Sequence, residues 1–189
     1  MISAIKVNGL WDEGYVLSEH TISSKYIGED PFGRPQFDKE YTELGKLLYS
    51  MKYNGHIDTS DQIVALSSEF VLGWLRDKEI GAVIPSPATK GRVVQPVYVI
   101  AEKIAKLLGT YYSEGVLSKT TQELTKDIPK EERQLQGTIR QNLPAKKPCN
   151  VLLIDDLSSS GQTANECVRV LREDENIRKV YFLAITKTK

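Results

Sequence analysis

The most informative part of the sequence is Val151-Leu-Leu-Ile-Asp155-Asp156-Leu-Ser158-Ser159-Ser160-Gly161-Gln162-Thr163. Its first four residues form a short apolar run, as expected of a strand that is buried on both faces. Two carboxylates end this run, and a hydroxyl-rich turn with one glycine then opens a predicted helix. This strand–turn–helix unit favours an α/β fold, in which ligands bind at the carboxyl ends of parallel strands.

The turn itself predicts a phosphate site. The first N–H groups of a helix are unpaired, and the helix dipole favours an anion beside them. Gly161 lets the backbone approach a ligand closely, and four side chains add hydroxyl donors: Ser158, Ser159, Ser160 and Thr163. The alternative is an ordinary helix N-cap after a strand. A cap explains one serine or aspartate, but not two carboxylates with four hydroxyls around one glycine.

Asp155 and Asp156 suit a different part of the same ligand, because carboxylates repel a phosphate. They accept protons from vicinal sugar hydroxyls, and Mg²⁺ prefers oxygen ligands of this kind. The ligand that fits is a sugar with a 5-phosphate at one end and diol oxygens at the other. The chain contains no P-loop, no dinucleotide-binding glycine fingerprint and no G-x-S-x-G elbow, which argues against those classes of protein.

The rest of the chain predicts alternating strands and helices. We expect a hairpin over residues 2–22, a loop over 23–37, helices over 38–53, 60–78, 95–108 and 161–174, and strands over 80–85, 110–117, 150–154 and 178–186. This order indicates a mostly parallel sheet flanked by helices. Residues 118–148 are polar without a sustained apolar period and predict a long excursion, which is either functional or an ordinary polar loop.

Composition narrows the class of partner. The 189 residues carry 25 basic and 25 acidic side chains, which argues against a nucleic-acid coat or a polybasic membrane binder. Residues 1–83 nevertheless hold 8 basic and 13 acidic side chains, whereas residues 84–189 hold 17 and 12. The excess of basic side chains in residues 84–189 indicates that this part binds a small anion. Chance dispersion of charge over the surface explains the asymmetry equally well.

The two cysteines and the start of the chain bear on location. Cys149 and Cys167 show no metal-binding spacing, which fits a reducing compartment. We expect no signal peptide, and no apolar run approaches the roughly 18 residues of a membrane span. A cytoplasmic protein without membrane contact is therefore predicted.

The run from Val151 to Thr163 resembles the ribose-5-phosphate motif of type I phosphoribosyltransferases, with serines at 159 and 160 where the family more often has threonines. This family uses phosphoribosyl pyrophosphate (PRPP) and Mg²⁺ to make or break the bond between ribose C1 and a nitrogen base. The resemblance implies an enzyme that transfers the 5-phosphoribosyl group to a nitrogen nucleophile and releases pyrophosphate. The acceptor, a small nitrogenous molecule, is not readable from the sequence.

Other stretches are similar to ComF-type competence proteins and amidophosphoribosyltransferase-like proteins. These are Tyr49-Ser-Met-Lys52-Tyr53-Asn-Gly55, Val83-Ile84-Pro85-Ser86-Pro87, and a looser match at Gln122, Leu124 and Arg133. The four-cysteine zinc module with which ComF proteins often begin is missing from this sequence. An alternative reading is therefore a non-catalytic accessory protein that binds PRPP or single-stranded DNA, although no basic run with interleaved aromatics supports it.

The resemblance also implies a set of site residues. Asp155 and Asp156 would be catalytic and would contact the metal indirectly, through ribose hydroxyls or water. The 5-phosphate would lie on Ser158, Ser159, Ser160, Gly161, Gln162 and Thr163. Pyrophosphate would lie on Ser86, Ala88, Thr89, Lys90 and Arg92, a segment that otherwise is a basic solvated turn. A flexible loop with Lys119, Lys130 and Arg133 would close over PRPP.

The same comparison suggests a division of the chain. Residues 1–37 would form an N-terminal hairpin and loop, and residues 38–189 would form the phosphoribosyltransferase domain. Two segments are candidates for a hood over the base, residues 1–37 and residues 110–117. A homodimer is left open. We expect Tyr111 and Tyr112 to pack in the core, although they could border the base site, and Cys167 to be a small buried hydrophobe.

Overall fold

A six-stranded, mostly parallel sheet forms the centre of the computed structural model, which describes residues 2–88, 94–120 and 137–188. The strand order is β1 (Ile5–Lys6), β2 (Glu13–Glu19), β10 (Ile177–Lys187), β9 (Cys149–Ser158), β5 (Ile80–Pro85) and β6 (Tyr111–Tyr112). All neighbours run parallel except β1, which pairs antiparallel with β2. The predicted α/β class is confirmed.

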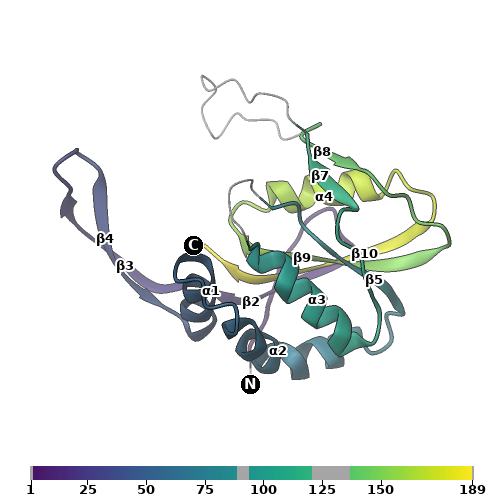
Figure 1. Cartoon of the computed structure of the whole chain (residues 1–189), viewed down its shortest axis with the longest axis horizontal. Coiled ribbons are helices and arrows are strands. Elements are labelled where there is room, and N and C mark those ends of the chain that lie inside the picture. The colour runs from purple at the N-terminus through teal and green to yellow at the C-terminus, as the bar shows by residue number, and fades with distance from the viewer. Residues whose placement is uncertain (1, 89–93, 121–136, 189) are drawn as a thin grey trace.

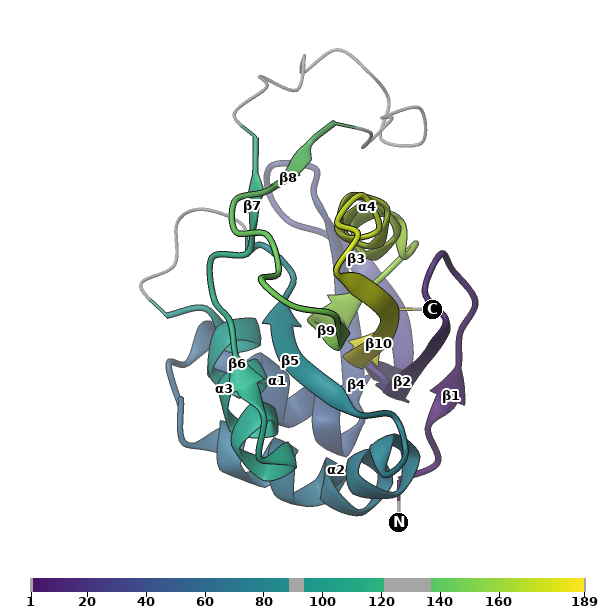
Figure 2. The same ribbon diagram turned by 90° about the vertical axis from the view of Figure 1, so that its right-hand side faces the viewer.

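Helices cover both faces of this sheet (Figures 1 and 2). One face carries α1 (Glu43–Tyr53), α2 (Thr59–Leu75) and α3 (Pro96–Leu108), and the other carries α4 (Gln162–Leu171). Because successive strand residues point to opposite faces, the apolar run of β9 serves both layers. Leu152 and Ile154 pack in the cluster below α1–α3, whereas Val151 and Leu153 pack in the cluster below α4.

The N-terminal third differs from the expectation. Residues 2–22 do hold a hairpin, β1 with β2, but β2 continues as a parallel neighbour of β10 inside the sheet. The predicted loop over 23–37 is wrong: β3 (Thr21–Glu29) and β4 (Pro35–Tyr41) form a second hairpin, which projects from the body (Figure 1). The glycine and proline signals belong to its turn, where Asp30 Oδ1 accepts the N–H groups of Phe32 and Arg34. Strand pairing thus overrides turn composition.

Other elements also differ at their ends. α1 starts at Glu43 rather than 38, because β4 runs to Tyr41 and Thr42 caps the helix by accepting the Gly45 N–H. The strand predicted over 110–117 is two short strands, β6 and β7 (Leu117–Lys119). β7 pairs with β8 (Ile139–Gln141), and this ribbon flanks residues 121–136, which lie outside the described ranges.

The most important extension concerns β9. It runs four residues past the predicted end, to Ser158, because β10 continues beside it and pairs Lys187 with Ser158. Asp155 and Asp156 therefore lie in the last part of a paired strand, not in the turn. Among the described residues, no helix has the length and apolar character needed to cross a membrane.

Candidate functional site

The carboxylate of Asp155 joins the ends of two neighbouring strands. Its Oδ1 accepts the Ser86 hydroxyl at 2.9 Å and the Asp156 backbone N–H at 2.9 Å. Ser86 follows β5 directly, and its own N–H donates to Ile154 O of β9 at 2.8 Å. Burial, together with the charge of Asp156, raises the pKa of Asp155 to about 6. Above that pH it is a carboxylate held by fixed donors.

Asp156 is paired with a lysine from another element. Lys52 Nζ, in the last turn of α1, lies 2.9 Å from Asp156 Oδ2, and the side chains are only 9% and 17% exposed. The predicted site residues did not include Lys52, although it lies in the 49–55 stretch quoted above. The pairing connects the α1–α3 layer to the end of β9.

Breaking this ion pair is expected to destabilise the fold. Lys52→Met leaves a poorly solvated carboxylate without its cation and should reduce the free energy of unfolding by about 3 kcal/mol. In a double-mutant cycle with Asp156→Asn, we expect a coupling of about 1–3 kcal/mol by urea denaturation.

The matched control is Lys103→Met. Lys103 is also paired with an aspartate, Asp61, but that side chain is 73% exposed. Lys103→Met should therefore reduce the free energy of unfolding by less than about 1 kcal/mol. Equal losses for the two lysine variants would contradict a buried role for Lys52.

A cavity of about 210 Å³ lies at this edge of the sheet. It brings together segments that are far apart in the chain. Its lining residues are Lys52, Ser86, Pro87, Ala88, Gln95, Val97, Lys119, Asp155, Asp156, Leu157 and Thr163. Six of the residues singled out from the sequence therefore share one cavity. They are Ser86, Ala88, Lys119, Asp155, Asp156 and Thr163.

The turn after β9 leads directly into α4. Ser159 and Ser160 are exposed, and Gly161 adopts a left-handed conformation (φ 73°) as the helix N-cap. A side chain there would be strained, so glycine is required by the backbone. Gln162 and Thr163 begin the first turn of the helix, and the Gln162 N–H donates a long hydrogen bond of 3.5 Å to Ser160 Oγ. Ser158 differs from its neighbours, because it is the last residue of β9 and is buried.

Several predicted contacts fall on residues outside the described ranges. These are Thr89, Lys90 and Arg92 of the pyrophosphate segment, and Lys130 and Arg133 of the flexible loop. The start of the pyrophosphate segment is described, and Tyr98 of α3 holds it, since its hydroxyl accepts the Ala88 N–H at 3.3 Å.

Two further side chains lie near Asp156. His20 Nδ1 is 3.1 Å from Thr186 Oγ1 at the end of β10, and the Thr186 hydroxyl donates to Asp156 O at 3.4 Å. Burial lowers the pKa of His20, with the charge of Lys52 acting in the same direction. The Tyr41 ring packs edge-on against His20. Spacing in the sequence gave no signal for this group, because it depends on the pairing of β2 with β10.

The aromatic expectations are met in part. Tyr112 packs against the apolar cluster below α3, but Tyr111 is 74% exposed, because β6 is a two-residue edge strand and turns this side chain outward. Cys167 is fully buried, as predicted.

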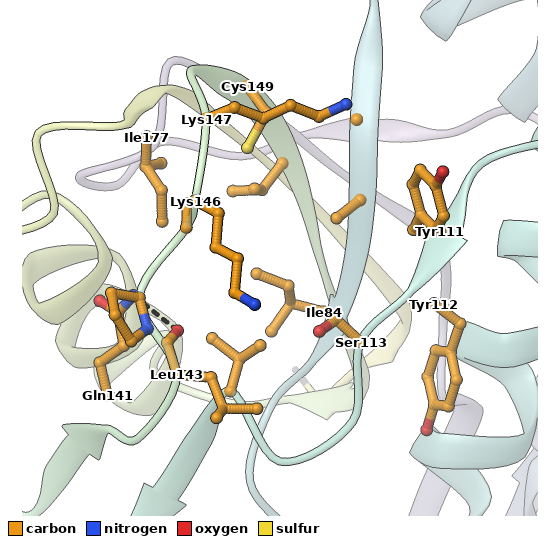
Figure 3. Close-up of a pocket in the computed structure, with 16 residues that line it drawn as sticks. Ile84, Tyr111, Tyr112, Ser113, Gln141, Leu143, Lys146, Lys147, Cys149 and Ile177 are labelled. Atoms are coloured by element: carbon orange, nitrogen blue, oxygen red, sulfur yellow. Dashed lines mark hydrogen bonds between the residues drawn. The ribbon is translucent and has the colours of Figure 1, made fainter.

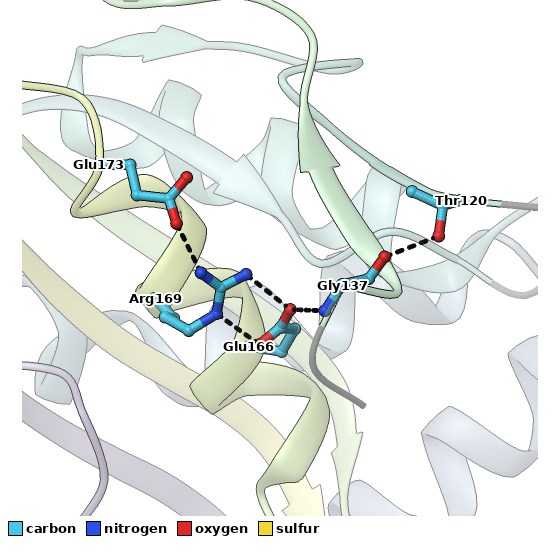
Figure 4. Close-up of polar contacts among 5 residues, drawn as sticks. All are labelled: Thr120, Gly137, Glu166, Arg169 and Glu173. Atoms are coloured by element: carbon cyan, nitrogen blue, oxygen red, sulfur yellow. Dashed lines mark hydrogen bonds and ion pairs between the residues drawn. The ribbon is translucent and has the colours of Figure 1, made fainter. Parts of the chain in front are cut away.

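A buried carboxylate fastens the β7–β8 ribbon to α4 (Figure 4). Glu166 of α4 accepts the Gly137 N–H at 2.7 Å and is paired with Arg169 on the same helix. Gly137 O in turn accepts the Thr120 hydroxyl at 3.0 Å. Lys119, which lines the site cavity, precedes Thr120 in the chain. Glu166 thus connects the helix that begins at the turn to the ribbon that carries Lys119.

The variant Glu166→Gln is expected to lose about 1–3 kcal/mol of stability near neutral pH. Arg169, with help from the Gly137 N–H, lowers the pKa of Glu166 below its ordinary value of 4.5. A lowered pKa gives stability that is present above the ordinary value and is lost as the pH falls through the lowered one. The difference between native chain and variant should therefore shrink on acidification, as followed by urea denaturation at several pH values.

Glu173→Gln is the control for this prediction. Glu173 contacts the same Arg169, but its side chain is 65% exposed. We expect a loss under about 1 kcal/mol and little change with pH. A pH-independent difference for Glu166→Gln would contradict the assigned role.

We compared the chain with known proteins, and the similarities found are to the fold of solved structures. No protein-family model and no curated protein matches the sequence. Among solved structures, adenine phosphoribosyltransferase from Trypanosoma brucei aligns with 99% of this chain and 87% of its own, at 13% identity and a TM-score of 0.49. Phosphoribosylpyrophosphate synthetase from Mycobacterium smegmatis aligns with 65% of this chain and 33% of its own, at 21% identity and a TM-score of 0.42. At these levels, function has to be argued from the site itself.

Proposed function

We propose that this protein is a phosphoribosyltransferase that binds PRPP with Mg²⁺ and transfers the 5-phosphoribosyl group to a nitrogen nucleophile. One observation carries the proposal: Asp155 and Asp156 lie near the carboxyl end of a buried parallel strand, and the glycine-capped start of α4 follows a few residues later. Diol acceptors and an anion site therefore lie a few residues apart at one edge of the sheet.

Each part of the substrate has a counterpart in the site. The 5-phosphate would lie at Ser159–Thr163, against the first N–H groups of α4. The ribose hydroxyls would donate to Asp155 and Asp156, since ionised carboxylates are acceptors only. Pyrophosphate would lie beside Ser86 and Ala88, on the segment that continues to Arg92. Lys119 would add a cation from the β7–β8 ribbon.

The donor set suits an ion that arrives with the substrate. Among the described residues, no three His, Cys, Asp or Glu side chains gather as a metal cage would require. Asp155 and Asp156 already accept from Ser86 and Lys52, so they would hold Mg²⁺ indirectly, through ribose hydroxyls or water. This ion commonly keeps several waters and uses one or two carboxylates with substrate phosphates. When bound, it would neutralise charge on pyrophosphate.

In the proposed reaction the bond between ribose C1 and the pyrophosphate oxygen breaks, and the electron pair leaves with pyrophosphate. The acceptor nitrogen donates its lone pair to form the new C1–N bond and afterwards releases a proton to solvent. The protein contributes positioning and electrostatic stabilisation. Asp155 and Asp156 fix the ribose, and the start of α4 fixes the opposite end of the substrate.

The proposed hood over the acceptor lies in residues 1–37, with 38–189 as the transferase domain. Within the N-terminal part, β2 belongs to the central sheet, and the β3–β4 hairpin stands outside it. His20 directly precedes β3, and Tyr41 ends β4, so both lie at the base of this hairpin. They lie on the Asp156 side of the site. A cytoplasmic location and a homodimer stay predictions.

The test is titration calorimetry with PRPP and Mg²⁺, followed by a screen of free bases and amines scored by pyrophosphate release. We expect PRPP to bind and one class of nitrogenous acceptor to release pyrophosphate. An absence of PRPP binding by the folded chain would overturn the proposal.

The second candidate is a non-catalytic accessory protein that binds PRPP or single-stranded DNA. The β3–β4 hairpin favours it to a degree, because Arg34 lies over the Phe32 ring and Lys39 over the Phe37 ring, in exposed positions. Binding to single strands that weakens steeply with salt, without any pyrophosphate release, would support this candidate instead.

A further inference from the structure

A second cavity, of about 440 Å³, lies on the α4 side of the sheet and reaches the amino ends of β9 and β10, away from the candidate active site (Figure 3). Its floor is formed by Ala82 and Ile84 of β5 and by Cys149 and Val151 of β9. α4 packs on β9, β10 and β8, and over β5 the irregular segment 142–147 forms the wall instead. This cavity shares no lining residue with the candidate active site.

The cavity exists for two reasons. The floor carries a small side chain, and the wall is held in place by hydrogen bonds to residues outside the cavity. Ala82 leaves space over β5 that a larger residue would fill. Asp174 Oδ2 accepts Gln141 Nε2 and the Ala145 N–H, both at 2.7 Å. Asn176 Nδ2 donates to Ala145 O at 2.8 Å. The wall therefore cannot collapse onto the floor without losing these hydrogen bonds.

The volume lies in the range of small-molecule sites, about 300–1,000 Å³, and the lining is mainly apolar, as in such sites. Tyr111 of β6 and Leu143 line the opening, and their side chains are 74% and 53% exposed. Burying this apolar surface under an apolar ligand would be favourable.

The charged side chains that line the cavity are both lysines. Lys146 extends into the cavity, and Lys147 lies at its edge (Figure 3). Within the described residues neither ammonium group has a hydrogen bond or an ion pair, and the lining contains no aspartate or glutamate. The Ser113 hydroxyl is drawn beside Ile84 in the same view. An anionic group in the cavity would thus meet a cation and a hydroxyl donor.

We propose that this cavity binds an aromatic acid, a small molecule with a flat apolar body and one anionic group. The body would pack on Ala82, Ile84 and Val151. The anionic group would accept hydrogen bonds from Lys146 Nζ and Ser113 Oγ. The site is separate from the proposed PRPP site, and the inference does not depend on that function.

Cys149 provides a built-in reporter for occupancy. Its sulfur lies among the lining residues, and the side chain is half-buried. The other cysteine, Cys167, is fully buried in the core. The rate at which iodoacetamide alkylates the folded chain therefore reports access to this cavity, and a bound ligand should slow it.

The experiment uses the full chain and two fluorescent probes of similar shape. The anionic probe is 8-anilinonaphthalene-1-sulfonate, and the neutral probe is N-phenyl-1-naphthylamine. We expect the anionic probe to bind in a 1:1 ratio and to slow alkylation of Cys149. Ala82→Leu should weaken both probes about 10-fold or more, because it fills the floor. Lys146→Gln should weaken only the anionic probe, by about 10-fold.

The matched control is Lys46→Gln, which removes an exposed lysine of α1 on the opposite layer and should change neither probe. Cooperative unfolding of each variant is checked first. If Ala82→Leu does not fold, the proposal is tested by comparing Lys146→Gln with Lys46→Gln. Equal binding of the anionic probe to Lys146→Gln and Lys46→Gln would overturn the proposal. So would protection of Cys149 that rises with protein concentration alone, since a second copy would then cover the cavity.

Discussion

Asp155→Asn/Asp156→Asn is expected to weaken PRPP binding by about 100-fold or more. Hydrogen bonds to charged groups contribute about 1.5–3 kcal/mol each, and two such acceptors would lose their charge. Together this corresponds to a factor of about 10²–10⁴ in the dissociation constant. Titration calorimetry with PRPP and Mg²⁺ measures it directly, and pyrophosphate release should fall at least as far.

The structure explains why this loss would not reflect unfolding. Burial raises the pKa of Asp155, which shows that its charged form is disfavoured in the fold. A neutral amide at position 155 removes that penalty and can still accept from Ser86, so Asp155→Asn alone should stay within a few degrees of the native chain in thermal stability. Asp156→Asn leaves Lys52 without its anion and should lower the free energy of unfolding by about 1–3 kcal/mol, so PRPP binding is compared well below the unfolding midpoint of the double variant.

A control with the same change in charge is Asp38→Asn/Asp77→Asn, at two exposed positions outside both cavities. It should bind PRPP like the native chain. If the variant at 155 and 156 binds PRPP as tightly as this control, the carboxylates do not hold the ribose, and the proposed site is wrong.

Phe182→Ala is expected to have the largest effect on stability. Phe182 is fully buried in β10, and its ring stacks on Trp11 with centroids 4.3 Å apart. Removing a buried phenylalanine side chain typically costs about 3–5 kcal/mol, because the lost burial is joined by a cavity that relaxes only in part. Since domains are stable by about 5–15 kcal/mol, the urea midpoint should fall by a large fraction.

The control for this prediction is Phe32→Ala in the turn of the β3–β4 hairpin. Phe32 is 84% exposed, so its removal should change stability by under about 0.5 kcal/mol. Similar midpoints for the two phenylalanine variants would contradict the placement of Phe182 in the buried cluster below α4. An unchanged denaturant slope in both would show that the comparison concerns the native state.

The central strands and the carboxylate pair could be predicted because their signals are local. The apolar runs at 80–85 and 151–154 are too short and too continuous for amphipathic helices, and they are β5 and the core of β9. Asp155 and Asp156 follow such a run, so their position at the edge of a parallel sheet follows from the fold class. The β3–β4 hairpin could not be predicted in this way. Its strands are largely exposed, and they are stabilised by pairing with each other, which leaves no apolar pattern.

The site shows the same division. Local patterns of residues were sufficient to predict the class of fold, the edge of the sheet at which ligands would bind, and the residues that form the turn into α4. The folded arrangement was needed to show that Lys52 pairs with Asp156, that Ser86 donates to Asp155, and that Glu166 holds the ribbon behind Lys119. These contacts join residues 29 to 104 positions apart in the chain. Such pairings depend on how strands and helices stack, because a side chain's partner across a fold is set by packing and register and not by its neighbours in sequence.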